Sequence, residues 1–88
     1  MKMIIVIVKD TDADGVTQAL TSSDFRVTRI ASTGGFLRSG VVTLLIGVSH
    51  ERVEAGIQIV RDKLMEAGAH EENRATIFVV PVQRFEQV

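Results

Sequence analysis

The segment from Phe25 to Gly40 gathers residue types that suit an anionic ligand carrying a flat ring. Glycines let a backbone approach a phosphate closely, hydroxyl and guanidinium groups donate hydrogen bonds to its oxygens, and the ring of Phe36 offers a face on which a base can stack. A simpler interpretation also fits, because paired glycines such as Gly34 and Gly35 are common in the turn of a β-hairpin. The residues alone leave both interpretations open.

Three arginines accompany these glycines. Arg26 and Arg29 lie in the expected strand and Arg38 in the turn after it, so together they can face one anion. A solvated strand edge that carries arginines is the alternative.

Patterns that would indicate catalysis or a metal site are missing from the sequence. His50 and His70 each lie beside acidic residues near a helix end and have no partner at metal-ligand spacing. The chain has no cysteine, hence no thiol nucleophile, and no Gly-x-Ser-x-Gly elbow. Gly35 and Gly40 match the two glycines of a P-loop, but Val41 replaces the lysine and a strand follows instead of a helix. We therefore expect a protein that is not an enzyme and uses no metal or cofactor.

Composition indicates one small folded domain over residues 1–88. The 45% apolar and 24% charged content is that of a globular chain, and the net charge of -1 provides no broad basic surface for a nucleic acid polymer. The aliphatic run from Ile4 to Val8 is too short to span a membrane, and no signal-peptide cleavage region accompanies it. A cytoplasmic location is the expectation.

Hydrophobic periodicity predicts alternating strands and helices. A capping-box spacing at Thr11 and Asp14 places the start of the first helix, and Gly68 stands where the second helix should end. The full expectation is strand Met3 to Val8, helix Thr11 to about Ser22, strand Phe25 to Ala31, strand Val41 to Val48, a helix capped by Ser49, and strand Ala75 to Val82. This order is that of the α+β ferredoxin-like βαββαβ sandwich with a four-stranded antiparallel sheet.

The strand patterns also predict self-association. Two helices cover only one face of such a sheet, yet the first, third and fourth strands are apolar on both faces. The uncovered face would be a large apolar patch unless another copy of the chain packs against it. Gly47, inside the third strand, indicates a bulge or a place where something approaches the backbone closely.

Three stretches carry a family resemblance: the opening Met1 to Val8, the run Asp24 to Gly40, and Ala75 to Val82. Together they resemble the PII-like cyclic di-AMP receptor family over nearly the whole chain, and Thr-Gly-Gly-Phe-Leu-Arg-x-Gly is the most specific part. The resemblance implies a homotrimer of PII-like, ferredoxin-like subunits with one cyclic di-AMP in each inter-subunit cleft. It further implies a signalling role exerted through an unknown downstream protein.

The resemblance also implies a set of ligand-binding residues. They are Arg26, Val27 and Thr28 on the strand wall, Gly35, Phe36 and Leu37 closing over a base, Gly47 allowing close approach, and Phe78 and Gln87 from a neighbouring subunit. A core position remains the alternative for Phe78.

This chain departs from the family pattern at three places that bear on nucleotide specificity. Val41 and Asp24 each stand where asparagine is expected, and the loop from Gly68 to Arg74 is short. Two other functions remain open. One is a PII-type regulator that senses ATP or ADP, although this chain shows no basic loop that could bind a triphosphate. The other is a small acylphosphatase-like hydrolase. Such a hydrolase needs an arginine and an asparagine around one phosphate. The only asparagine of the chain, Asn73, lies in a different loop from the glycine-rich turn and its arginines. A trimeric adaptor without ligand is a further alternative.

Overall fold

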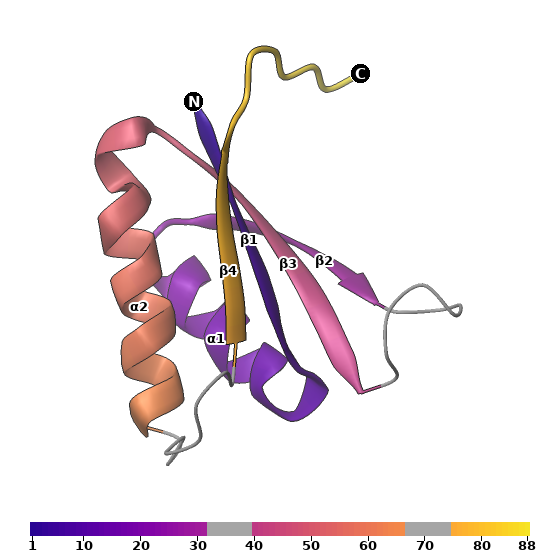
Figure 1. Ribbon diagram of the computed structural model, residues 1–88, viewed down its shortest axis with the longest axis vertical. Helices are drawn as coiled ribbons and strands as arrows, with labels where there is room; N and C mark the ends of the chain where they lie inside the picture. Colours follow the sequence, from indigo (N-terminus) through magenta and orange to yellow (C-terminus); the bar gives the residue numbers. More distant parts are fainter. Residues whose placement is uncertain (32–39, 67–74) are drawn as a thin grey trace.

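The computed structural model describes residues 1–31, 40–66 and 75–88. Within them the chain forms β1 (Lys2–Lys9), α1 (Asp10–Ser22), β2 (Arg26–Ala31), β3 (Val41–Val48), a 3-10 turn η1 (His50–Arg52), α2 (Val53–Glu66) and β4 (Ala75–Pro81). The strands make one antiparallel sheet in the order β2-β3-β1-β4 (Figure 1). The predicted α+β ferredoxin-like arrangement is confirmed.

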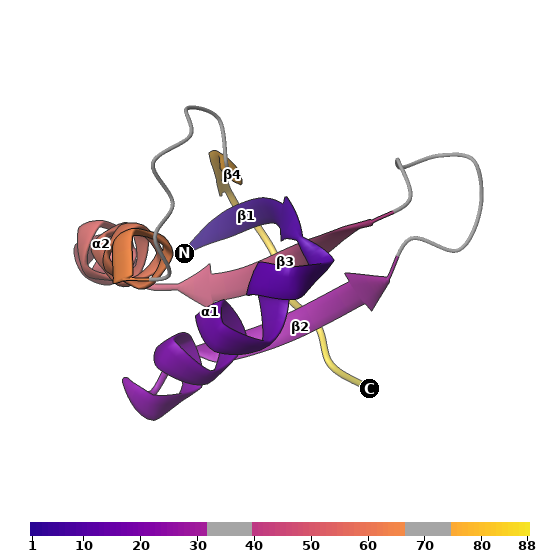
Figure 2. The same ribbon diagram turned by 90° about the horizontal axis from the view of Figure 1, so that it is seen from below.

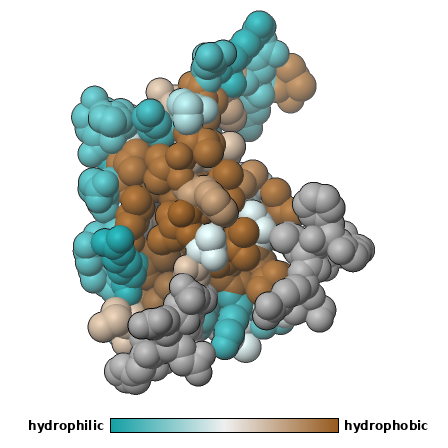
Figure 3. All heavy atoms as spheres, viewed as in Figure 1, coloured by the Kyte–Doolittle hydropathy of each residue, from teal (hydrophilic) through white to brown (hydrophobic). Residues whose placement is uncertain are grey.

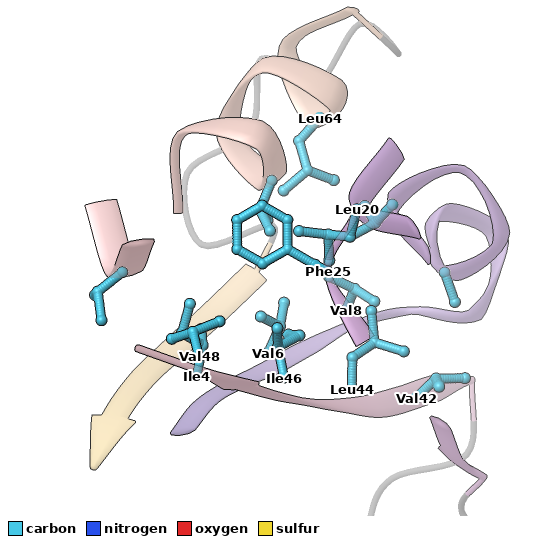
Figure 4. Packing of buried hydrophobic residues seen from close by; sticks show 14 residues of the cluster. Ile4, Val6, Val8, Leu20, Phe25, Val42, Leu44, Ile46, Val48 and Leu64 are labelled. Atoms are coloured by element: carbon cyan, nitrogen blue, oxygen red, sulfur yellow. The ribbon is translucent and has the colours of Figure 1, made fainter. Parts of the chain in front are cut away.

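Both helices pack on the same face of the sheet, and the core lies between them and the strands (Figure 2). Alternate residues of each central strand point into this core, because side chains of a strand project to opposite faces in turn. In β1 and β3 these buried residues are Ile4, Val6, Val8, Val42, Leu44, Ile46 and Val48 (Figure 4). The helices contribute Ala13, Val16 and Leu20 from α1 and Val53, Val60 and Leu64 from α2.

The predicted helix caps are wrong. Helix α1 follows β1 directly, with Lys9 as the N-cap residue and no side-chain cap, so Thr11 lies inside the first turn. One amide of that turn is satisfied by the backbone instead, since the Asp10 N–H donates to the Gly40 carbonyl at 2.8 Å. Ser49 precedes η1 rather than α2 and makes no side-chain cap. The predicted stop at Gly68 lies outside the described residues.

Arg52 fixes the turn that leads from α1 into β2. Its guanidinium donates to the carbonyl oxygens of Ser23 at 2.9 Å and Asp24 at 3.2 Å, and it lies 3.9 Å from the centre of the Phe25 ring. Asp24 adopts a φ of 66°, the left-handed conformation in which asparagine and glycine are also favoured. Because Phe25 is buried beneath this turn, the next residue, Arg26, starts β2 on the opposite face of the sheet.

The face of the sheet away from the helices is apolar, as Figure 3 shows over the strands. Ile5 of β1 pairs with Leu45 of β3 on one side and Phe78 of β4 on the other. Phe78 is 51% exposed and Ile30 of β2 is 44% exposed. The expectation that the first, third and fourth strands are apolar on both faces is therefore confirmed, while the homo-oligomer inferred from it stays a prediction.

Candidate ligand-binding cleft

A cleft of about 580 Å³ opens on this apolar face, at the end of the sheet where β1 begins and β3 ends. The C-terminal residues beyond β4, which Figure 1 shows extending past this end of the sheet, form its other wall; they are called the tail, residues 82–88. The lining residues are Met1, Met3, Arg26, Val27, Thr28, Leu45, Gly47, Val82, Arg84, Phe85 and Gln87.

Antiparallel pairing places the strand residues of the cleft together. Arg26 pairs with Gly47, and Thr28 pairs with Leu45, so the guanidinium and hydroxyl groups of β2 stand next to the end of β3. Gly47 also pairs with Met3 of β1. A Cβ added at Gly47 would meet no atom within 4 Å, so this glycine leaves the floor of the cleft open beside Arg26.

Arg29 does not join Arg26 at the cleft. Arg29 lies three residues after Arg26 in β2, and because side chains alternate along a strand it faces the helix side of the sheet. There its Nη1 donates to the Asp14 carboxylate of α1 at 2.5 Å. The hypothesis that Arg26 and Arg29 face one anion is therefore wrong. Arg38, the third arginine of that hypothesis, lies outside the described residues.

The tail reaches the cleft because of the register between β1 and β4. Lys2 pairs with Pro81, and the Val82 N–H donates to the Met1 carbonyl at 3.0 Å, so the chain leaves the sheet beside the start of β1. From there Arg84 and Phe85 line the cleft, and Arg84 is ion-paired with Glu86. Sequence reasoning missed Arg84 and Phe85; their only signal was adjacency to Gln87, because the tail was too short to classify.

The structure brings five of the nine predicted ligand residues together at one cleft. These are Arg26, Val27, Thr28, Gly47 and Gln87. Gln87 lines the cleft of its own chain, and its assignment to a neighbouring subunit's site stays a prediction. Phe78 lies on β4, outside the cleft lining, and Gly35, Phe36 and Leu37 lie outside the described residues.

The two described departures from the family pattern lie away from the cleft lining. Asp24 is in the turn before β2, where its backbone carbonyl binds Arg52. Val41 begins β3 at the end opposite Gly47 and pairs with Lys9. The short loop from Gly68 to Arg74 is not among the described residues.

Residues 1–31, 40–66 and 75–88 contain no group of three or more His, Cys, Asp or Glu side chains placed to hold a metal ion. No helix in the same part of the chain is long and apolar enough to cross a membrane.

Comparison with known proteins identifies related sequences and structures. A family model described as a cyclic-di-AMP receptor matches residues 1–71. A crystal structure of a functionally unknown protein from Pediococcus pentosaceus is 31% identical, with a TM-score of 0.76 over 99% of this chain and 96% of that one. The similarity to the crystal structure supports the fold, and the match to the family model places the chain in a receptor family.

Proposed function

We propose, because this chain belongs to the cyclic-di-AMP receptor family, that it is a non-enzymatic signalling protein which binds cyclic di-AMP in inter-subunit clefts of a homotrimer and relays binding to a partner protein. Membership of the family supports cyclic di-AMP binding in a signalling role. The clefts, the trimer and the relay are the proposal.

The observation that carries the proposal is the charge of the cleft. Its described lining contains two guanidinium groups, those of Arg26 and Arg84, and no carboxylate, although the whole chain has a net charge of -1. A cyclic dinucleotide carries one negative charge on each phosphodiester, and guanidinium is the side chain best suited to such oxygens. The hydroxyl of Thr28, on the same face of β2 as Arg26, adds a neutral donor.

The cleft also has the size and the apolar surface that a nucleotide needs. Its volume of about 580 Å³ falls within the range of small-molecule sites. Met3, Leu45 and Phe85 supply apolar surface for a base, and Gly47 leaves room for the ligand to approach the strand. Stacking of a base on an aromatic ring such as Phe85 contributes roughly 1–3 kcal/mol, by analogy with single-stranded nucleic acid binding.

The uncovered face of the sheet supports assembly of the clefts between subunits. Phe78, Ile30 and Leu45 lie on this face with the cleft at one end of it, so a second copy packed there would close over the cleft. In that arrangement Phe78 of one subunit is available to a neighbour's ligand, which gives a reason for its exposure at the sheet edge.

Calorimetric titration of the purified protein with cyclic di-AMP, cyclic di-GMP, ATP and ADP tests the proposal. We expect saturable binding of cyclic di-AMP in the micromolar range or tighter, with one ligand per subunit, and weaker binding of cyclic di-GMP. Preferential binding of ATP or ADP would favour a PII-type energy sensor instead. No saturable binding of cyclic di-AMP would overturn the proposed function.

A further inference from the structure

Arg84 and Glu86 form an ion pair in the tail, and only Arg84 lines the cleft. Arg84 lines the cleft, whereas Glu86, which accepts a hydrogen bond from Arg84 Nη2, does not. Both side chains are largely exposed, at 81% for Arg84 and 60% for Glu86. The positive member of the pair is thus available to a molecule in the cleft, while the negative member competes for it from outside.

We propose that Arg84 and Glu86 form an anion-responsive latch in the cleft, resting on the proposed function for the identity of the anion. In the free protein the Arg84 guanidinium is held by Glu86. When a cyclic dinucleotide occupies the cleft, one phosphodiester replaces the Glu86 carboxylate as the partner of Arg84, and the tail closes against the ligand.

The energetics favour such an exchange. An exposed ion pair between side chains contributes little to stability, because water and salt screen both charges, so giving up Glu86 costs little. A phosphodiester in the partly enclosed cleft accepts from the guanidinium fork with less competition from water. Each of the two phosphodiesters then has its own arginine, Arg26 on the strand wall and Arg84 on the tail wall.

The tail can move without disturbing the sheet. The Val82 N–H donates to the carbonyl of Met1, just before β1, and Arg84 lies two residues beyond Val82. Residues 83–88 belong to no helix or strand, and their side chains are exposed. A change of partner at Arg84 therefore shifts the tail, including Phe85 and Gln87 on the cleft, while β4 keeps its register.

A double-mutant cycle in the full chain tests the latch. Glu86→Gln removes the competing charge, so we expect cyclic di-AMP to bind about two- to fivefold more tightly. Arg84→Gln removes the group that the phosphodiester binds, so we expect about tenfold weaker binding. In the Arg84→Gln background the second change, Glu86→Gln, should have no effect on affinity, because the competition no longer exists.

The outcomes separate the latch from the proposed function. Tighter binding by Glu86→Gln only when Arg84 is present supports the latch. The latch is overturned if the wild type binds cyclic di-AMP and neither substitution changes the affinity. It is also overturned if Glu86→Gln has the same effect in the wild type and in Arg84→Gln. Either result leaves the proposed function standing. Failure of the wild type to bind cyclic di-AMP overturns both. Thermal unfolding of each variant controls for loss of fold, and we expect unchanged melting temperatures because the pair is exposed.

Discussion

Arg26 of β2 and Gly47 of β3 are direct partners across the sheet, so one of the two cleft arginines stands beside a residue that projects no side chain. The fold of the single chain does not require glycine there, since a Cβ at position 47 would meet no atom within 4 Å. A glycine inside a strand weakens it, so its presence is explained by the space it keeps for a ligand under the proposed function.

Gly47→Val should separate binding from folding. Valine suits a strand and its Cβ has open space, so we expect no loss in the free energy of unfolding, but its methyl groups fill the cleft and weaken cyclic di-AMP binding at least tenfold. Gly56→Val is the matched control: it makes the same substitution at a buried glycine of α2, away from the cleft lining. A Cβ at Gly56 would lie 3.0 Å from Ile4 Cδ1 and 3.3 Å from Phe25 Cε1, both in the core, so this variant should lose about 2–3 kcal/mol of stability.

Urea unfolding and calorimetric titration of both variants provide the measurements. Gly47→Val with normal affinity would contradict a ligand beside Gly47, and Gly47→Val with reduced stability would show that the glycine serves the fold.

The two arginines of β2 should differ in their effect on binding. Arg26→Gln removes a guanidinium from the cleft, and we expect about tenfold or greater loss of affinity with little change in stability. Arg29→Gln breaks an exposed pair with Asp14 on the other face, so affinity should be unchanged and stability should fall by at most about 0.5 kcal/mol. Equal losses of affinity in the two variants would indicate a general charge effect instead of a contact.

Arg52 should be a stabilising residue with no part in binding. Arg52→Ala removes two hydrogen bonds to the turn carbonyls and the guanidinium on the Phe25 ring, and we expect the free energy of unfolding to fall by about 1–2 kcal/mol. Arg52→Lys keeps the charge but loses the planar fork, so it should recover only part of that loss. Chemical denaturation measures both, and full recovery by lysine would argue against the fork geometry.

Periodicity predicted the sheet well because the strand patterns here are strong. The run from Val41 to Val48 was predicted with its observed bounds. The capping box at Thr11 failed because β1 continues to Lys9 and α1 follows at once, so a backbone carbonyl replaces the side-chain cap. A local spacing rule cannot detect a partner from a distant segment.

The cleft was only partly predictable for a related reason. Arg26 and Thr28 follow from alternation along β2, and Gly47 is unusual enough in a strand to be noticed. Arg84 and Phe85 reach the cleft only because Val82 bonds to Met1, a consequence of strand register that the sequence of the tail does not contain. Alternation along β2 places Arg29 on the other face, but its pairing with Asp14 depends on where α1 packs, which the strand pattern does not contain.

The last prediction concerns the apolar face that Ile5 and Phe78 share. If copies of the chain pack through this face, burying the exposed half of the Phe78 ring contributes about 2 kcal/mol per subunit. Phe78→Ser should then shift the sedimentation-equilibrium mass from trimer toward monomer at low micromolar concentration. Met65→Ser is the control, because Met65 is 65% exposed on α2, which packs on the opposite face. A trimeric mass for both variants would place the subunit interface elsewhere, and a monomeric wild type would remove the trimer from the proposed function.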